Sequence, residues 1–416
     1  MVEKIKLDWV VVRRAPVQRL ESSDGIDLAA DDAKGPLAVS PVNIATDAMT
    51  HDEAREQSAA EDTIDLAPAL PICLITATPD AAATEIPEVA WGLAAVHADK
   101  SPYDGAGVKV AILDTGIDEK YADLEAFKNL KFEVRNFVQG ESEHDLDGHG
   151  THCAGTILGR DVDGHRIGVA RGISDVFIGK VIGENGGRTE NIVNAIQAAA
   201  AWGADVISMS LGMDFPAYRE RLVQKFGLDA RQATSMALEG YLQNVRMFDR
   251  LSTALRGEPG LIKGTVVVAA SGNESNAPAF TIHASPPSNA EGFLSVAALA
   301  QDGALASFSN VGASVAAPGV GIWSAKRGGG LQSKSGTSMA TPHVAGIACL
   351  WAQKLKMAAA WKKYPGADDT QARAKAATMQ VDSARVVDAV KASCAALAPK
   401  ISDADVLWGA PQAPSE

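Results

Sequence analysis

The stretch VKVAILDTG, residues 108–116, decides the fold expected for this chain. Its first part is a nearly continuous apolar and β-branched run, which is typical of a strand buried on both faces. Similar runs recur along the chain and alternate with helical patterns such as the one over 189–202. These runs are SDVFIGKVIG (174–183), ADVISMSLG (204–212), GTVVVAASGN (264–273) and GFLSVAAL (292–299). We therefore expect an α/β fold of three layers, in which helices cover both faces of a mostly parallel central sheet.

Polar residues stand at the ends of several of these strands. Asp114 ends the first run, Ser210 lies near the end of the third and Asn273 ends the fourth. The carboxyl ends of parallel strands meet at one edge of a sheet, which is where such folds build their active sites. We therefore expect these residues to contribute to a common site.

Two further residues lie where a helix is expected to begin. His149 lies in GHGTHCAGT (148–156), whose small residues allow the start of a helix to pack closely against neighbouring backbone. Ser338 lies in SGTSMATPHVAG (335–346), a glycine turn followed by an apolar helix that would tolerate Pro342 only in its first turn. A hydroxyl at a helix N-terminus is placed where developing negative charge is favoured.

Each of these residues taken singly has a simpler interpretation. Asp114 could be a turn residue, His149 a structural histidine and Ser338 an ordinary helix cap. Together they occur in the order Asp, His, Ser, which is one of the chain orders in which catalytic triads are found. The combination is far more specific than any of its parts.

Three segments carry a resemblance to a known family. The sequences DTG (114–116), HGTH (149–152) and GTSMATPH (336–343) together resemble the signature segments of the subtilisin-like serine proteases. The resemblance runs from about Trp91 to the C-terminal region. It implies the three-layer subtilisin-like fold and a serine endopeptidase that hydrolyses peptide bonds through an acyl-enzyme intermediate.

The same resemblance implies a role for each catalytic residue. Ser338 would be the nucleophile, His149 the general base and then the general acid, and Asp114 the residue that orients the imidazole. Asn273 matches the family's oxyanion asparagine, whose amide acts together with the backbone N–H of Ser338. The catalytic set expected from the resemblance is therefore complete.

Two segments resemble the family's substrate-binding surfaces. One resembles the strand that pairs with the substrate backbone and comprises Ser210, Leu211 and Gly212. The other resembles the wall of the primary specificity pocket and includes Ala270, Ser271 and Gly272. Because strand addition is largely tolerant of sequence, the expected substrate is a polypeptide of open side-chain preference. Glu274 could favour a basic side chain there or be an inert surface residue.

No cofactor is needed for the implied chemistry, and no Cys/His arrangement has zinc spacing, so no catalytic metal is expected. Family members often bind calcium in the loop after the histidine helix, which is RDVDG (160–164) in this chain. Asp123 resembles another ligand position of the family. A structural calcium site and a plain Asp-Gly turn are both open interpretations, and the loop departs from the family's usual ligand pattern.

We expect the chain to divide into an N-terminal extension, residues 1–90, and a subtilisin-like peptidase domain, residues 91–416. The extension begins with a strand-like alternation from Ile5 to Val11 and continues as an acidic, Ala-rich tract. It is either a small, partly disordered extension or a prosegment that blocks the enzyme. We expect a zymogen that is cleaved between about Ala81 and Trp91, because the catalytic resemblance begins only after this linker.

A helical insertion is expected at about 213–263. Apolar residues recur there at helical spacing and predict the face that docks on the protein body. They are Leu238, Tyr241, Leu242, Val245, Phe248, Leu251 and Leu255. Because the insertion follows the expected substrate strand, we hypothesise that it borders the cleft and restricts substrates.

The composition of the chain narrows the classes of molecule that it is expected to bind. A formal net charge of −13 argues against nucleic acid, and no stretch approaches the roughly 20 apolar residues of a membrane span. Four cysteines in 416 residues are no disulfide framework, so we expect reduced thiols. Expected partners are a polypeptide substrate and the chain's own prosegment or an inhibitor protein. We expect a cytoplasmic location, with unconventional export or an absent signal peptide as the alternative.

Two other functions fit the same motifs. The first is a binding or regulatory protein that keeps the fold without activity. The second is a peptide-joining enzyme, because an amine can resolve the acyl-enzyme in place of water. The presence of Asp114, His149, Ser338 and Asn273 favours proteolysis over both.

Overall fold

A computed structural model places most of the chain. It describes residues 5–14, 42–74, 86–256, 264–398, 401–402 and 404–415. The acidic tract, the linker before residue 86 and the end of the insertion at 257–263 lie outside the described residues.

Seven strands form the central sheet, and every pair of neighbours in it is parallel. The spatial order is β14-β13-β12-β10-β5-β7-β6. The strands are β5 (Lys109–Asp114), β6 (Lys131–Asn136), β7 (Asp175–Lys180), β10 (Val206–Met209), β12 (Val266–Ala270), β13 (Leu294–Leu299) and β14 (Val315–Pro318). The predicted parallel sheet is therefore confirmed.

Helices cover both faces of this sheet, because alternate residues of each strand point to opposite sides. Val110 and Ile112 of β5 lie in one core with α3 and α7, whereas Ala111 and Leu113 lie in a second core with α4 and α6. These helices are α3 (His149–Leu158), α7 (Thr337–Lys363), α4 (Thr189–Trp202) and α6 (Ala230–Arg256). The three-layer α/β prediction is confirmed.

Smaller elements complete the body. They are α2 (Trp91–Ala95), the 3₁₀ turns η2 (Tyr121–Asp123) and η3 (Glu125–Phe127), the hairpin β15 (Ile322–Ala325) and β16 (Leu331–Lys334), α8 (Asp369–Ala377) and α9 (Ser383–Ala392). Among the described residues, no helix combines the length and the apolar character that crossing a membrane requires.

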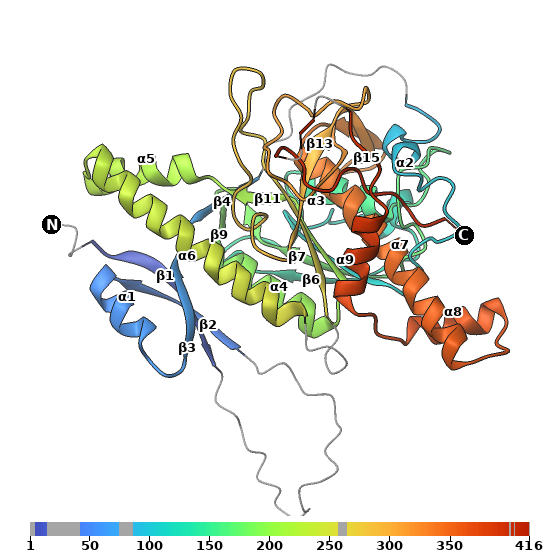
Figure 1. Cartoon of the computed structure of the whole chain (residues 1–416), viewed down its shortest axis with the longest axis horizontal. Coiled ribbons are helices and arrows are strands. Elements are labelled where there is room, and N and C mark those ends of the chain that lie inside the picture. The colour runs from blue at the N-terminus through green and yellow to red at the C-terminus, as the bar shows by residue number, and fades with distance from the viewer. Residues whose placement is uncertain are drawn as a thin grey trace, which may run out of the picture.

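The N-terminal region folds as a three-stranded antiparallel sheet in the order β2-β1-β3, with one helix. Its elements are β1 (Leu7–Arg14), β2 (Val42–Met49), α1 (His51–Ser58) and β3 (Thr63–Pro68). The predicted strand at the start of the chain is confirmed, with Leu7, Trp9 and Val11 buried. Figure 1 shows this sheet lying against α6, at the opposite end of the molecule from α8.

The next strand, β4 (Pro71–Leu74), leaves that sheet and enters the protein body. It belongs to a second, four-stranded sheet in the order β11-β4-β9-β8, all of whose pairs are antiparallel. Its other strands are β8 (Ile182–Gly183), β9 (Gly186–Arg188) and β11 (Leu211–Met213).

The insertion forms two helices, α5 (Phe215–Phe226) and α6. The predicted apolar face of α6 is partly wrong, because the side chains of Leu238 and Leu242 are 51% and 46% exposed. Small or polar residues, among them Ala237, Gly240 and Asn244, face the protein instead. A hydrophobicity pattern misses this face because close approach selects small side chains there.

Candidate active site

The carboxyl end of β5 carries Asp114, whose side chain is 1% exposed. Its Oδ1 accepts a hydrogen bond from the backbone N–H of Thr115 at 2.8 Å and lies 2.7 Å from Nδ1 of His149. The carboxylate is therefore held by its own strand end and aimed at the imidazole.

His149 is the first residue of α3, directly after Gly148, which has a φ of +93°. The helix can start this close to β5 only because residue 150 is glycine. A methyl group at Gly150 would lie 2.2 Å from the carbonyl oxygen of Gly116. The sequence-based expectation that small residues permit close packing is confirmed here.

Asp145, which none of the sequence motifs indicated, holds the strand end and the helix start together. Its buried carboxylate accepts hydrogen bonds from the hydroxyl of Thr115 at 2.8 Å, the N–H of Gly148 at 2.7 Å and the N–H of Thr151 at 2.9 Å. An acid three residues before Gly148 was the available signal, since carboxylates accept N–H groups at helix starts.

The electrostatics of His149 are set by its neighbours. Burial disfavours the imidazolium, but the Asp114 carboxylate and the Cys153 side chain together outweigh it, so the pKa of His149 is raised well above its ordinary value. Nε2 of His149 is buried and makes no hydrogen bond to the described residues. The ring thus has one nitrogen fixed by Asp114 and the other able to accept a proton.

Ser338 is the second residue of α7. Its Oγ donates to the carbonyl oxygen of Ser210 at 3.3 Å. Its own carbonyl oxygen accepts from the hydroxyl of Ser210 at 3.0 Å and from the thiol of Cys153 at 3.5 Å. In a regular helix the carbonyl oxygen of Ser338 would accept the N–H of residue 342, but Pro342 has no N–H. The two side chains take the place of this missing donor.

Pro342 also corrects one expectation. It is the sixth residue of α7, so it lies inside the helix and not in its first turn. The helix begins earlier than expected, at Thr337, because Asn273 accepts the N–H of Thr337 at 2.9 Å.

Cys153 lies one helical turn after His149, with its Sγ 3.8 Å from Nδ1. Burial raises the pKa of this thiol, which therefore stays protonated beside the histidine. Among the described residues, Asp114, His149 and Cys153 form the one group of three potential metal-ligand side chains. All four cysteines of the chain are free thiols.

Asn273 follows β12 and faces the start of α7. Its Oδ1 accepts from both the N–H and the hydroxyl of Thr337, each at 2.9 Å. These two bonds fix the amide so that Nδ2 is the end able to donate to an oxyanion. The neighbouring Glu274 accepts a 2.6 Å hydrogen bond from Nδ2 of Asn310, so its carboxylate is already held by the protein.

The wall expected for the specificity pocket continues directly from β12. Ala270, Ser271 and Gly272 are all buried. Ser271 is fixed by a backbone hydrogen bond to Val296 at 3.0 Å and by its hydroxyl to the carbonyl oxygen of Asn310 at 3.2 Å. This wall is thus a rigid extension of the central sheet.

The strand expected to bind substrate is occupied by the chain's own N-terminal region. Leu211, Gly212 and Met213 of β11 pair antiparallel with Leu74, Cys73 and Ile72 of β4. The other edge of β4 pairs with β9, where Ile72 lies opposite Gly187 and Pro71 lies opposite Arg188. Ser210 immediately precedes β11, so this added strand runs directly toward Ser338.

The loop considered for calcium is organised by basic side chains. The guanidinium of Arg160 donates to the carbonyl oxygens of Leu158, Arg171 and Ile173. Asp161 pairs with the guanidinium of Arg171 at 3.1 Å. A surface hollow of about 330 Å³ beside the loop is lined by two acids and three bases, namely Glu125, Asp161, Lys128, Arg160 and Arg171.

The acids themselves are not gathered around a common point. Asp163 and Gly164 form a tight turn with φ values of +49° and +82°, and Asp123 lies exposed in η2. The Asp-Gly turn interpretation therefore describes the loop, and its residues do not fit a calcium ion.

Comparison with known proteins gives a consistent picture. The profile of the subtilase family matches residues 105–387. The chain is 36% identical to Subtilisin DY of Bacillus licheniformis over 270 residues, which is 63% of this chain and 84% of that protein. It is 35% identical to Alkaline elastase YaB of Bacillus sp. (strain YaB) over 282 residues, 66% of this chain and 63% of that protein. Subtilisin Savinase of Lederbergia lenta is 35% identical over 273 residues, 64% of this chain and 85% of that protein. The chain therefore belongs to the subtilase family and is a subtilisin-like serine endopeptidase, as its motifs predicted.

Proposed function

We propose that this endopeptidase cleaves polypeptides with Ser338 as nucleophile, His149 as general base and acid, and Asp114 as the residue that orients the imidazole. The observation that carries the proposal is the 2.7 Å contact between Asp114 and Nδ1 of His149, in the buried site that also holds Ser338. It fixes the tautomer in which Nε2 accepts protons.

In the first half of the reaction, the hydroxyl of Ser338 gives its proton to Nε2 of His149 while Oγ bonds to the scissile carbonyl carbon. The carbonyl oxygen becomes an oxyanion, which Nδ2 of Asn273 and the N–H of Ser338 stabilise. The imidazolium then gives its proton to the leaving amine as the C–N bond breaks. The products are the free amine and an acyl-enzyme.

In the second half, His149 takes a proton from water as the water oxygen attacks the acyl carbon. The imidazolium returns that proton to Oγ of Ser338, and the carboxylic acid product leaves. Throughout, the Asp114 carboxylate stabilises the positive charge that forms on His149. The raised pKa of His149 supports this role, because it reports the same interaction.

We further propose that the chain is made as a zymogen whose N-terminal region blocks the cleft. Strand β4 pairs with β11, the strand expected to bind substrate, and its other edge pairs with β9, so β4 fills the position between those two strands. Added strands are a common way for proteins to bind peptides. The arrangement supports a bound, self-inhibiting segment.

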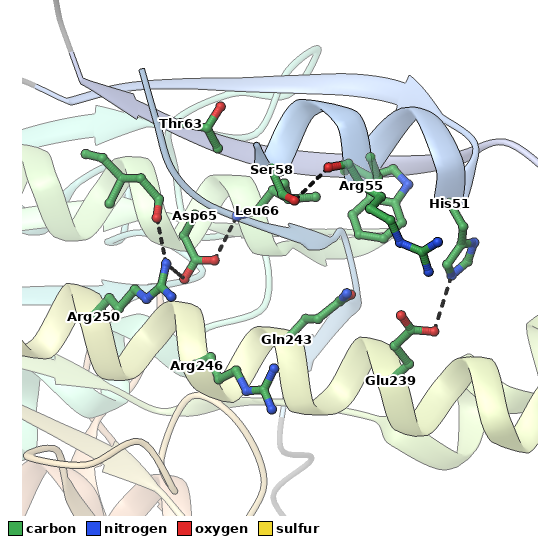
Figure 2. Close-up of a pocket in the computed structure, with 13 residues that line it drawn as sticks. His51, Arg55, Ser58, Thr63, Asp65, Leu66, Glu239, Gln243, Arg246 and Arg250 are labelled. Atoms are coloured by element: carbon green, nitrogen blue, oxygen red, sulfur yellow. Dashed lines mark hydrogen bonds and ion pairs between the residues drawn. The ribbon is translucent and has the colours of Figure 1, made fainter. Parts of the chain in front are cut away.

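Outside β4, the part of the interface that surrounds a cavity is polar, as is typical of a separable contact (Figure 2). His51 faces Glu239 at 3.7 Å, and Asp65 faces Arg250 at 3.4 Å, across a cavity of about 430 Å³. Burial raises the pKa of Asp65 despite the nearby Arg250, so docking places this carboxyl in an unfavourable setting. These features support release of the N-terminal region after cleavage.

The register of β4 on β11 suggests a cleavage position that lies earlier in the chain than the window expected from the sequence. Leu74 pairs with Leu211, and the residue before Leu211 is Ser210. The carbonyl oxygen of Ser210 accepts a hydrogen bond from Oγ of Ser338. A chain running in this register meets Ser338 soon after the position of Leu74. We therefore propose self-cleavage close to Leu74, and the window Ala81–Trp91 stays an untested alternative, part of which lies outside the described residues.

Intact-mass analysis of wild type beside Ser338→Ala tests these proposals, with and without a fluorophosphonate probe and with casein as substrate. We expect one probe adduct on wild type only, casein cleavage by wild type only, and an N-terminal mass loss that identifies the cleaved bond. An intact N-terminus on fully active enzyme would refute the zymogen. Absence of both probe uptake and cleavage would favour an inactive scaffold, and ligated peptide products would favour the joining enzyme.

Two further predictions are unchanged by the geometry. The cytoplasmic location expected from cysteine usage stays a prediction that subcellular fractionation would test. Restriction of substrates by the insertion also stays a prediction, which cleavage assays after deletion of the insertion would test.

A further inference from the structure

The segment from the last residue of β3 to the residue before β4, residues 68–70, is bound by two buried side chains of the protein body. Nδ2 of Asn244, on α6, donates to the carbonyl oxygen of Pro68 at 2.9 Å. The backbone N–H of Leu70 donates to Oγ1 of Thr189, the first residue of α4, at 3.0 Å. Both Asn244 and Thr189 are 0% exposed. We call these two side chains the Asn244–Thr189 pair.

The pair is linked into one network. Nδ2 of Asn244 also donates to the carbonyl oxygen of Gly240 at 2.9 Å, and the hydroxyl of Thr189 lies 3.3 Å from Oδ1 of Asn244. The two amide hydrogens of Asn244 are thus both used, and the threonine hydroxyl can donate to Oδ1 while it accepts from Leu70. Such a network fixes both side chains in place.

Only backbone groups of the N-terminal region enter this network. The two shorter bonds hold the carbonyl of Pro68 and the N–H of Leu70, and the hydroxyl of Thr189 also lies 3.4 Å from the carbonyl oxygen of Leu70. None of these contacts depends on a side chain of the N-terminal region. At Gly240 an added methyl group would approach Cγ of Pro68 to 3.0 Å, so glycine there leaves room for the residue at that position. Any extended polypeptide in the same register could make the same two bonds.

The network continues the cleft without a break, since Pro71 follows directly on Leu70 and opens β4. Once the N-terminal region leaves, the Asn244–Thr189 pair loses both of its partners on that segment. Buried polar groups that lose their partners favour a replacement that restores the bonds. A polypeptide substrate lying on β11 and β9 is suited to provide it.

We propose that the Asn244–Thr189 pair forms a distal subsite that binds the backbone of a polypeptide substrate at the positions held here by Pro68 and Leu70. These positions precede that of Leu74 by six and four residues. The subsite makes the enzyme favour long, extended substrates over short peptides, and it gives α6 of the insertion a part in substrate selection. The inference rests on the proposed function, in which the N-terminal region vacates the cleft.

A length comparison tests it, using full-length protein incubated until its mass is constant. The long substrate is a quenched fluorescent peptide with the sequence of residues 66–80, and the short one spans residues 71–80, both with Cys73→Ser. Mass spectrometry checks that both are cut at the same bond. We expect kcat/KM to be about tenfold higher for the long peptide, which corresponds to about 1.4 kcal/mol.

Variants assign the effect to the two side chains. Thr189→Val, which is nearly isosteric, and Asn244→Ala should each lower the ratio of long-peptide to short-peptide kcat/KM severalfold. Gln243→Ala is the matched control, because Gln243 lies beside Asn244 on α6 and lines the cavity of Figure 2 without a described hydrogen bond to residues 68–70. It should keep the wild-type ratio.

A modified substrate avoids any dependence on variant folding. N-methylation of the long peptide at the Leu70 amide removes the N–H that Thr189 accepts. N-methylation at Ala69 is its control, because that N–H bonds to the carbonyl oxygen of Asp8 within the N-terminal region itself, at 2.7 Å. With wild-type enzyme, methylation at Leu70 should abolish most of the length advantage, whereas methylation at Ala69 should leave most of it.

The outcomes separate this inference from the function beneath it. Equal kcat/KM for long and short peptides, or equal effects of the two methylations, would overturn the subsite while leaving the endopeptidase intact. Failure of wild type to cut either peptide, with no difference from Ser338→Ala, would overturn the proposed function and the subsite with it.

Discussion

Nδ1 of His149 lies 2.7 Å from Oδ1 of Asp114 inside a site where both side chains are almost fully buried. The carboxylate raises the pKa of His149 well above 6.5. Because the proposed base must be neutral, kcat/KM should fall as pH falls through this raised pKa, and the midpoint should lie above 6.5. Rate measurements on a short peptide from pH 5 to pH 10 would check this.

Asp114→Asn supplies the comparison for that profile. Removing the negative charge should shift the midpoint to lower pH and reduce kcat on the order of 10⁴-fold, because the imidazolium loses its counter-charge and its tautomer is no longer fixed. A variant that kept the wild-type midpoint would show that Asp114 does not set the pKa of His149.

Asp145 should be needed for stability as well as for turnover. Its carboxylate accepts the hydroxyl of Thr115 and the N–H groups of Gly148 and Thr151, which join the end of β5 to the start of α3. Asp145→Asn should lower the free energy of unfolding by about 2 kcal/mol and reduce kcat with little effect on KM. Urea denaturation in a Ser338→Ala background and peptide kinetics in the active enzyme measure the two effects.

Asp147→Asn is the matched control for Asp145→Asn. The Asp147 side chain is 50% exposed, and the substitution weakens its ion pair with Lys334, in which Oδ1 and Nζ are 3.7 Å apart. Exposed ion pairs contribute little, so we expect a change in unfolding free energy below about 0.5 kcal/mol. Similar losses for the two variants would contradict a specific role for Asp145.

The central sheet and the edge that carries the site were predictable because their signals are local. Runs such as VKVAILDTG contain the apolar, β-branched residues of a doubly covered strand, and a parallel sheet brings its strand ends together. Asp114 and Asn273 therefore could be assigned to one edge before any contact was known. The start of α3 at His149 was also accessible, because small residues around it signal close packing.

The missed features depend on partners far away in the chain. Nothing within β4 itself shows that it pairs with β11, about 140 residues later, and nothing near Asp145 shows that Thr115 donates to it. The buried face of α6 was partly mispredicted for the same reason. Gly240 faces inward because Pro68 approaches it, which only the tertiary structure reveals.

His343 should make the fold sensitive to acid. It is buried, its Nδ1 donates to the carbonyl oxygen of Met339 at 2.8 Å, and burial lowers its pKa from 6.5 to about 4. As pH falls from 6.5 toward 4, the unfolded chain binds a proton that the folded chain does not, so stability is lost. The loss attributable to His343 should be about 2 kcal/mol between pH 6.5 and pH 5.

Urea denaturation of the Ser338→Ala protein at several pH values would measure that loss. Adding His343→Gln should make the decline shallower by about the same amount, whereas adding His97→Asn, at an exposed histidine, should not. Part of the acid sensitivity should persist in His343→Gln, because burial also lowers the pKa of His152, to about 3. Parallel declines in all three proteins would exclude His343 as a source.

Arg160 should stabilise the loop after α3 without help from a metal ion. Its guanidinium donates to three backbone carbonyl oxygens, those of Leu158, Arg171 and Ile173, and thereby satisfies acceptors that would otherwise need a cation or water. Arg160→Ala should lower the free energy of unfolding by about 1–3 kcal/mol, and Arg160→Lys by less, because an ammonium cannot reach three acceptors in one plane.

Thermal unfolding of Ser338→Ala protein in EDTA and in millimolar calcium gives the complementary test. A protein that binds calcium only in its folded state would show a transition temperature that rises with calcium concentration. Because Arg160 already bonds to the loop carbonyls and Asp161 is paired with Arg171, we expect the two transition temperatures to agree within about 1 °C. A saturable rise of several degrees, lost in Asp161→Asn, would instead place a calcium ion in this loop and contradict the assignment of Arg160.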